Sequence, residues 1–319
     1  MQHGGPLGLG ESKPDSLSPS PAEHASPAKA ELWQQVRDGL VQLAQEGNAD
    51  VARYGDLITN EAACCRFLRG AKGNVCKAVD MFRKHLEWRI QYGLESVVDE
   101  DFTDLKAHEE LYWTGRDKDG VVTLMWRLHK HDASRTNGAR FVRFFVHQIE
   151  TGLRSSPQYP NAQFNILVDL QQVGYANADK EMSIILQSVL ATNYPKVRKG
   201  LFVFPINWFV QMFWDSLLKP VLSTLQPDIE DKICPLTGDW KAKLLERYDA
   251  SEIEKEFGGQ LDLSARPMLS ALSYQPISYS QVAFLAVCVC VYTHTNTPGC
   301  THTHTHTHTH THTHTHVYT

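Results

Sequence analysis

Apolar residues recur every three or four positions in three segments near the start of the chain. This spacing places them on one face of a helix, and it predicts helices over 30–45, 59–70 and about 74–93. The apolar face of the first segment is formed by Leu32, Val36, Leu40 and Leu43. Amphipathic helices that follow one another so closely can bury these faces together. We therefore expect a helical unit over 29–95.

Further along the chain, short apolar runs alternate with helical segments. The runs of strand length are 120–128, 162–173, 200–206 and 231–236, and the helical segments are 138–153, 179–195, the residues after 206, and 239–248. This alternation is typical of strand–helix–strand units, in which helices join parallel strands and cover the sheet. The expected fold class is therefore α/β, with a mainly parallel sheet over 111–263.

One helical segment, within FVFPINWFVQMFWDSLLKPVL at 202–222, has an unusually wide apolar surface. The residues of this surface are Trp208, Phe209, Met212, Phe213, Trp214, Leu217 and Leu218. They follow Asn207, which is a suitable N-cap, and they extend beyond one side of a helix. One interpretation is a core helix of a large domain. The other is a helix that closes a hydrophobic pocket with one side and meets a membrane with the other.

Three basic residues lie just before the strand that leads into this helix. They are Lys196, Arg198 and Lys199, in the sequence YPKVRKG. Near an anionic membrane each such charge contributes roughly 1 kcal/mol to binding. The alternative is a solvated basic loop. The neighbouring aromatic helix favours the membrane interpretation.

Composition restricts the class of protein. The chain has 319 residues, of which 42% are hydrophobic, and a formal net charge of −5, which is typical of a soluble globular protein with one or two domains. The mildly acidic balance argues against nucleic acid as a partner, because nucleic-acid-binding domains are usually basic. Attraction to an anionic surface would therefore have to come from a local patch.

The two ends of the chain have biased compositions. Residues 1–28 are rich in Gly, Pro and Ser and lack the pattern of a signal peptide, so we expect a disordered leader. We expect a low-complexity, disordered tail over 264–319. Within it, 301–316 alternates Thr and His, which fits a translated dinucleotide repeat or, alternatively, a metal-binding tract. The apolar run from Val282 is shorter than the ~20 residues that span a bilayer, and a partial interfacial contact is left open.

The sequence gives no positive sign of catalysis. It has no nucleophile elbow, phosphate-binding loop, zinc-helix motif or dinucleotide fingerprint in a strand–turn–helix context, so we expect no enzyme and no cofactor. Asp169 ends a strand, where it is either a turn residue or a functional group. His129 and His131 flank the end of another strand, without the further ligands of a metal site. The seven cysteines lack zinc or redox spacing and are expected to be reduced thiols.

Several motifs, in order along the chain, resemble the CRAL-TRIO lipid-binding family. They are CCRFLRGAKGNVCKAVDMFRKHLEWRIQYG, GRDKDGVVTLMWRL, FNILVDLQQVGYAN, NYPKVRKGLFVFPINWF, LLKPVLS, DKI and EKEFGGQL. The resemblance covers 32–263. It implies an N-terminal three-helix unit packed on an α/β lobe that encloses an apolar pocket, with the wide apolar helix as a mobile gate.

The resemblance also implies a function and a set of site residues. We expect a cytoplasmic, peripherally membrane-associated protein that binds one phospholipid or other small lipid and transfers or presents it at anionic membranes. The expected pocket residues are Val122, Leu124, Trp126, Phe164, Ile166, Val168, Phe202, Phe204, Phe209, Met212, Phe213 and Leu217. The expected headgroup or membrane-binding residues are Lys196, Arg198, Lys199 and Lys232. The main alternative is a protein-interaction adaptor without lipid exchange, and a hydrolase is a weaker one.

Departures from the family pattern leave the ligand open. Members that exchange phosphatidylinositol have a glutamate after the YP pair, where this chain has Lys196, although the lysine of DKI, Lys232, is retained. The matched arrangement needs opposite charges at these two positions. Gln171, Gln172 and Gly174 stand where phosphatidylcholine-binding members have small hydroxyl residues. Neither headgroup is therefore indicated by the sequence.

Overall fold

The computed structural model describes residues 27–206, 208–220 and 233–263, all within one compact unit of the chain. All but the last two residues of the expected leader over 1–28 lie outside these ranges, and so does the whole tail over 264–319. Lys232 and Asn207 also lie outside them.

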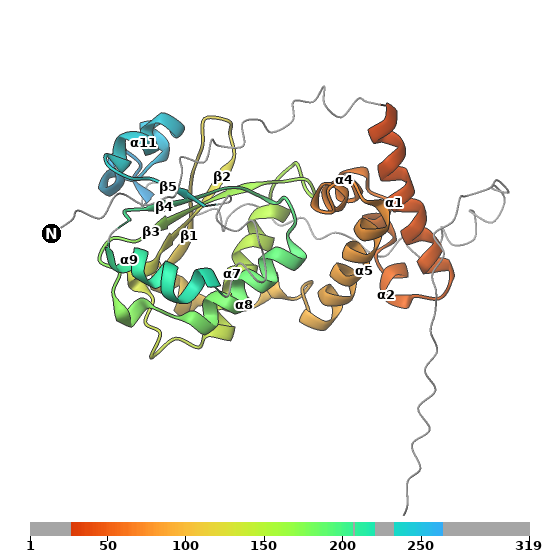
Figure 1. Ribbon diagram of the computed structural model, residues 1–319, viewed down its shortest axis with the longest axis horizontal. Coiled ribbons are helices and arrows are strands. Elements are labelled where there is room, and N and C mark those ends of the chain that lie inside the picture. The colour runs from red at the N-terminus through yellow and green to blue at the C-terminus, as the bar shows by residue number, and fades with distance from the viewer. Residues whose placement is uncertain (1–26, 207, 221–232, 264–319) are drawn as a thin grey trace, which may run out of the picture. The chain divides into compact units, whose positions relative to one another are not determined.

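A five-stranded sheet lies at the centre of the larger part of the fold (Figure 1). Its strands are β1 (Leu111–Arg116), β2 (Val122–Arg127), β3 (Phe164–Asp169), β4 (Arg198–Phe204) and β5 (Cys234–Pro235), in that order across the sheet. β1 is antiparallel to β2, and the other neighbours are parallel. The expected α/β class with a mainly parallel sheet is confirmed. β1 was not among the strands expected from the sequence.

Helices cover both faces of the sheet. The helices α7 (Gly138–Arg154) and α8 (Lys180–Asn193) form the crossovers that parallel strands require, and Figure 1 shows them below the sheet. On the other face lie α11 (Trp240–Arg247) and the short 3₁₀ helix η8 (Lys255–Phe257). Because alternate strand residues point to opposite faces, β1, β2, β3 and β4 each supply apolar residues to two separate cores.

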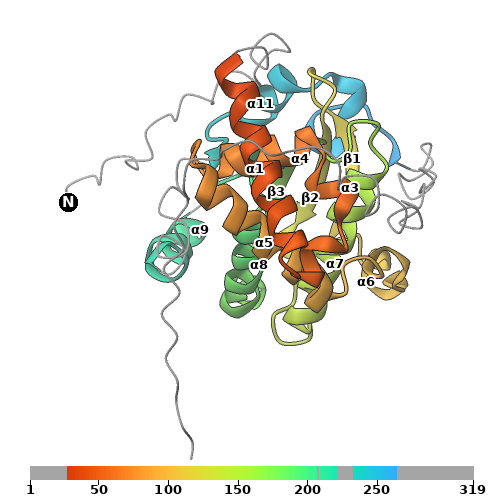
Figure 2. The ribbon, with the colours of Figure 1, turned by 90° about the vertical axis from the view of Figure 1, so that its right-hand side faces the viewer.

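The helical unit has its own core. It consists of α1 (Pro27–Gln45), α2 (Ala49–Ala52), α3 (Gly55–Ile58), α4 (Glu61–Gly70) and α5 (Val75–Tyr92). Figure 2 shows α1 running alongside α4 and α5, and both pack against it. The Asn60 and Asn74 side chains cap α4 and α5, and Gly93 ends α5 with a left-handed backbone conformation. The three predicted helices are therefore present, with two short helices between the first and second.

The helical unit and the sheet layers share a tightly packed junction. A Cβ atom added to Gly70, at the end of α4, would lie 2.8 Å from the Cβ atom of Pro195, which follows α8. The rings of Trp88 and Tyr194 meet edge to face, with centroids 6.0 Å apart. The Arg66 guanidinium donates a hydrogen bond of 3.2 Å to the Pro160 carbonyl. This part of the junction has no room for a side chain at position 70.

Short elements complete the described chain. Between α5 and β1 lie η2 (Val97–Asp99) and α6 (Thr103–Ala107), and the remaining 3₁₀ helices are η3 (Leu128–Lys130), η4 (Tyr175–Asn177) and η7 (Ala250–Glu252). The wide apolar segment after β4 forms α9 (Trp208–Phe213) and then a π-helical segment, η5 (Trp214–Leu218). The sequence predicted a helix here without the change of helical type.

Candidate functional site

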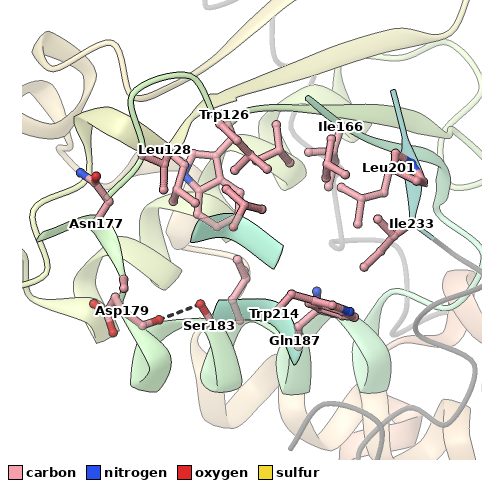
Figure 3. Close-up of a pocket in the computed structure, with 18 of the residues that line it drawn as sticks. Trp126, Leu128, Ile166, Asn177, Asp179, Ser183, Gln187, Leu201, Trp214 and Ile233 are labelled. Atoms are coloured by element: carbon pink, nitrogen blue, oxygen red, sulfur yellow. Dashed lines mark hydrogen bonds between the residues drawn. The ribbon is translucent and has the colours of Figure 1, made fainter. Parts of the chain in front are cut away.

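A mainly apolar cavity lies between the sheet, α8 and the α9–η5 segment (Figure 3). Its volume is about 190 Å³, well above the ~10–15 Å³ that one water molecule needs. The described apolar residues of its lining are Trp126, Leu128, Phe145, Ile166, Val168, Leu170, Val173, Ala178, Leu186, Leu190, Leu201, Val203, Ile206, Val210, Trp214, Ile233 and Pro235. A cavity of this character suits a hydrophobic ligand.

Strand register brings the sheet residues of the cavity together. Trp126, Val168 and Val203 lie side by side across β2, β3 and β4, and Ile166 is paired with Leu201. Residues paired in this way in parallel strands point to the same face of a sheet. The sheet wall of the cavity is therefore a patch of adjacent side chains, all on the α7–α8 face.

Helix α8 provides the opposite wall. Ser183, Leu186, Gln187 and Leu190 line the cavity, at the spacing of one helical face. Asp179 is the N-cap of the helix, and its carboxylate accepts a hydrogen bond of 2.8 Å from the Met182 backbone N–H. This periodicity was visible in the sequence but was not used to predict the lining residues.

At the end of the cavity near α8's first turn, the polar groups already have partners. The Asn177 amide donates to the carbonyls of His129 and His131, and its oxygen accepts from the Gly174 N–H. The Ser183 hydroxyl donates to the Asp179 carbonyl at 2.7 Å, as the dashed line in Figure 3 marks. These bonds leave mainly hydrocarbon facing the cavity at this end.

The ring of a buried histidine contacts Asp179, one of the residues at this end of the cavity. The two ring nitrogens of His131 lie 3.1 Å from a Glu110 oxygen and 3.2 Å from an Asp179 oxygen. Burial alone would lower the pKa of His131, but its hydrogen bonds to the two carboxylates and their negative charges raise it overall. The histidine links the segment before β1 to the N-cap of α8. The sequence suggested no role for it.

The structure brings only some of the predicted pocket residues to the cavity. Trp126, Ile166 and Val168 line it. Leu124 and Phe164 are buried on the same face but belong to the core against α7, with Val122 partly buried beside them. Their roles as ligand contacts remain predictions.

In β4, the side chains that line the cavity are not the ones expected from the sequence, but those that alternate with them. Phe202 and Phe204 point to the opposite face, where Phe204 stacks on Trp240 with ring centroids 4.7 Å apart. The guanidinium of Arg247 covers the Phe202 ring. Leu201 and Val203 line the cavity instead. The pairing of Ile166 with Leu201 fixes this alternation.

The described side chains of the expected gate form two groups, one that lines the cavity and one that is exposed. Trp214 and Val210 line the cavity, whereas Trp208 is 73% exposed and Met212 is 37% exposed. The side chains of Phe209, Phe213 and Leu217 lie outside the described residues. The segment therefore presents one aromatic residue to the cavity and another to the surface.

The three basic residues of YPKVRKG have different surroundings. Arg198 lines the cavity, and Lys196 is exposed. The Lys199 ammonium forms ion pairs of 2.8 and 2.6 Å with Asp117 and Asp119. The charge of Lys199 is thus largely compensated within the protein, and Lys196 is the residue of the three that is most available at the surface.

Asp169 lies on the face of the sheet away from the cavity. One of its oxygens accepts a hydrogen bond of 2.9 Å from the Gln171 N–H, so it forms a turn after β3. The other oxygen lies 3.7 Å from the His129 ring and 3.9 Å from the Arg127 guanidinium. Burial raises the pKa of this carboxyl group. The turn interpretation of Asp169 agrees with this geometry.

The described part of the chain offers neither a metal site nor a membrane-spanning helix. Within 27–206, 208–220 and 233–263, no three His, Cys, Asp or Glu side chains are grouped so that they could bind a metal ion. In the same ranges, no helix combines the length and the apolar character needed to cross a bilayer.

Comparison with known proteins relates this chain to lipid transfer proteins. Residues 106–259 match the family model described as CRAL/TRIO domain. Phosphatidylinositol/phosphatidylcholine transfer protein SFH7 of Arabidopsis thaliana is 28% identical over 214 residues, which cover 61% of this chain and 38% of that protein. The SEC14 cytosolic factor of Yarrowia lipolytica is 26% identical over 219 residues, which cover 63% of this chain and 44% of that protein. The chain thus spans less than half the length of these relatives.

A solved structure shares the fold. The crystal structure of Sfh5 superposes with a TM-score of 0.57, at 14% sequence identity, over 82% of this chain and 96% of that one. At this identity the likeness concerns the fold alone. The structural match covers a larger share of the chain than the family model does.

Proposed function

We propose that this chain, whose residues 106–259 match the CRAL/TRIO domain family model, binds one phospholipid or other small lipid in the cavity and transfers or presents it at membranes. The observation that carries the proposal is the apolar cavity between the sheet, α8 and α9–η5. The names of the relatives, which describe transfer of phosphatidylinositol and phosphatidylcholine, support it.

Transfer through water needs a protein that covers the hydrocarbon. Exposing ~30 methylenes of a two-chain lipid to water costs on the order of 20 kcal/mol, at ~0.8 kcal/mol for each methylene. A helix that covers the cavity in solution and moves at the membrane avoids this cost. We assign this gate function to α9–η5, because it supplies Val210 and Trp214 to the cavity wall.

The same segment is suited to meet the membrane. Trp208 and Met212 are one helical turn apart and are both exposed. Aromatic side chains are favoured at the membrane interface, where one end is apolar and the other is hydrated. The exposed Lys196 adds a positive charge on the loop before β4. We place the protein in the cytoplasm, peripherally bound to anionic membranes, with no catalytic centre.

Native mass spectrometry of the full-length chain, followed by extraction and identification of bound lipid, tests the proposal. We expect one lipid per chain. Leu190→Trp places a large side chain on the cavity face of α8, so it should remove most of the bound lipid. Thr192→Trp adds the same side chain at an exposed position of α8 and should keep the lipid.

An empty protein would point to the adaptor instead. If the purified chain carries no lipid and takes none from mixed vesicles, while it remains folded, the lipid-binding proposal is wrong. Equal lipid content in the Leu190→Trp and Thr192→Trp variants would show that lipid binds elsewhere.

A further inference from the structure

Two hydrogen-bond donors of the cavity wall lack partners among the described residues. Gln187 of α8 and Trp214 of η5 both line the cavity and are partly buried. Neither the Gln187 amide nor the Trp214 indole N–H makes a hydrogen bond within 27–206, 208–220 and 233–263. Figure 3 shows both side chains on the wall opposite Ile166, and α8 and η5 are in contact.

This wall differs from the polar end of the cavity at the start of α8. There the polar groups of Asn177 and Ser183 are bonded within the protein. The Gln211 amide, which also lines the cavity, donates to Asp215 at 2.5 Å. A hydrocarbon ligand that covers the Gln187 and Trp214 donors would remove their access to water without replacing it by a hydrogen bond, which is costly. A ligand that completes the bonding of Gln187 and Trp214 would therefore be favoured over a pure hydrocarbon.

The two donors determine the chemistry of the group that fits. An indole N–H can only donate, and the amide of Gln187 offers two N–H donors beside its oxygen. The matching ligand group is a hydrogen-bond acceptor, such as a carbonyl oxygen. An anionic acceptor is less suitable, because Asp215 follows Trp214 directly and carries a negative charge. Arg198 is the only cation among the described lining residues, and it lies at the start of β4.

We propose that Gln187 and Trp214 hold an uncharged hydrogen-bond-accepting group of the lipid, an ester carbonyl or its equivalent. The hydrocarbon of the ligand then extends along Ile166 and Val168 toward Leu170. This inference rests on the proposed lipid-binding function and specifies the class of ligand at the same cavity. It makes both side chains specificity-determining contacts rather than parts of the core.

Three probes of equal chain length test this assignment. The full-length chain is incubated with phosphatidylcholine vesicles that contain a trace of methyl palmitate, hexadecane or palmitate, and the protein-bound probe is measured after the vesicles are sedimented. The wild-type chain should take up methyl palmitate in preference to hexadecane and palmitate. Gln187→Met and Trp214→Phe should each lower methyl palmitate uptake by about fivefold, which is the loss of one neutral hydrogen bond. Hexadecane uptake should not change.

Further variants separate this effect from a general disturbance. Gln187→Glu keeps the size of the side chain but replaces the donor by a carboxylate, so it should lower methyl palmitate uptake more than Gln187→Met does. Trp240→Phe is the control for Trp214→Phe, because Trp240 lies on the other face of the sheet against Phe204. It should leave the ratio of methyl palmitate to hexadecane unchanged. Thermal melts establish that each variant is folded.

Three results would overturn the assignment. An unchanged ratio of methyl palmitate to hexadecane in every variant, with normal uptake, would refute it while the lipid-binding function stands. Preferred uptake of palmitate that is lost in Arg198→Met would place an anionic head at Arg198 instead. No uptake of any probe or of phosphatidylcholine would reject the proposed function together with this inference.

Discussion

His131 is a single buried side chain that joins two carboxylates, and its protonation should affect stability. The raised pKa means that the folded protein holds this proton more tightly than the unfolded chain does. The stabilisation is complete at pH values below the usual histidine pKa of 6.5 and is lost as the pH rises through the higher pKa of the folded state. We expect His131→Gln to lower the free energy of unfolding by about 1–3 kcal/mol at pH 6, and by less at pH 8.

The measurement is urea denaturation of both proteins across this pH range. Other histidines affect the absolute curves in the opposite direction, because burial lowers the pKa of His85, His129 and His147. The difference in the free energy of unfolding between wild type and variant isolates the contribution of His131. The other ring contact of His131 is with Phe141. A difference that is constant with pH would mean that the histidine is neutral throughout.

At the residue scale, the sequence predicted the strand of β4 but not which of its side chains face the cavity. Both alternate sets are apolar: Leu201 and Val203 on one face, Phe202 and Phe204 on the other. A strand with helices on both sides has no polar face to fix its orientation. The choice comes from the register with β3, which depends on residues distant in the sequence. Larger side chains were therefore a poor guide to the cavity.

At the element scale, buried charges connect α7 to the segment after α5 and to α8. Arg154 and Glu150, one turn apart on α7, have side chains that are 3% and 4% exposed and form an ion pair of 3.0 Å. Arg154 also pairs with Glu95, and Glu150 accepts a hydrogen bond of 2.8 Å from Tyr194, just after α8. These contacts hold α7, α8 and the end of the helical unit in one arrangement.

Removing one charge of this network should be more harmful than removing both. Arg154→Met leaves Glu150 buried without its cation, and we expect a loss of about 3–5 kcal/mol in the free energy of unfolding. The double variant Glu150→Met with Arg154→Met should lose less than Arg154→Met alone, because no isolated charge is left. Urea denaturation measures both. Arg135→Met removes an 85% exposed arginine and is the control; an equal loss in it would contradict the argument.

Elements with a regular spacing of apolar residues were predictable from the sequence. Elements that depend on contacts with distant parts of the chain were not. The apolar spacing of α4 and α5 and the Asn residues that cap them are local signals. The antiparallel strand β1 has its apolar residues together in its first half rather than in alternation, and it is paired with β2. The apolar residues of α9 and η5 extend over more than one side of the segment, so their spacing did not indicate the change from α-helix to π-helix. Contacts with distant segments decide such cases.

For the whole molecule, the family resemblance and the fold were both available from the sequence, and both are confirmed. The motifs that carried the resemblance are short and ordered along the chain, so they identify the topology. Lys199 forms ion pairs with Asp117 and Asp119 in the turn between β1 and β2, and Arg198 lines the cavity. A basic cluster in the sequence therefore becomes three residues with different surroundings, which alters the expected mode of membrane binding.

Membrane attraction should depend on Lys196 more than on its basic neighbours. Lys196 is exposed on the loop before β4, and Trp208, which follows β4, is also exposed. A basic residue near an anionic surface contributes roughly 1 kcal/mol, so Lys196→Glu should weaken binding to phosphatidylserine vesicles by about fivefold or more. The effect should fall at high salt because mobile ions screen it. Vesicle sedimentation at low and high salt measures both quantities.

The control must change the net charge by the same amount at a position away from the proposed membrane surface. Lys255→Glu does so, because Lys255 is exposed in η8, which lies on the face of the sheet opposite the cavity. Equal weakening by Lys196→Glu and Lys255→Glu would mean that total charge, rather than an oriented surface, governs binding. Lys199→Glu is unsuitable for this test, because it would also break two ion pairs and place a third acid beside Asp117 and Asp119. Loss of vesicle binding by Lys196→Glu alone would show that the loop before β4 faces the bilayer.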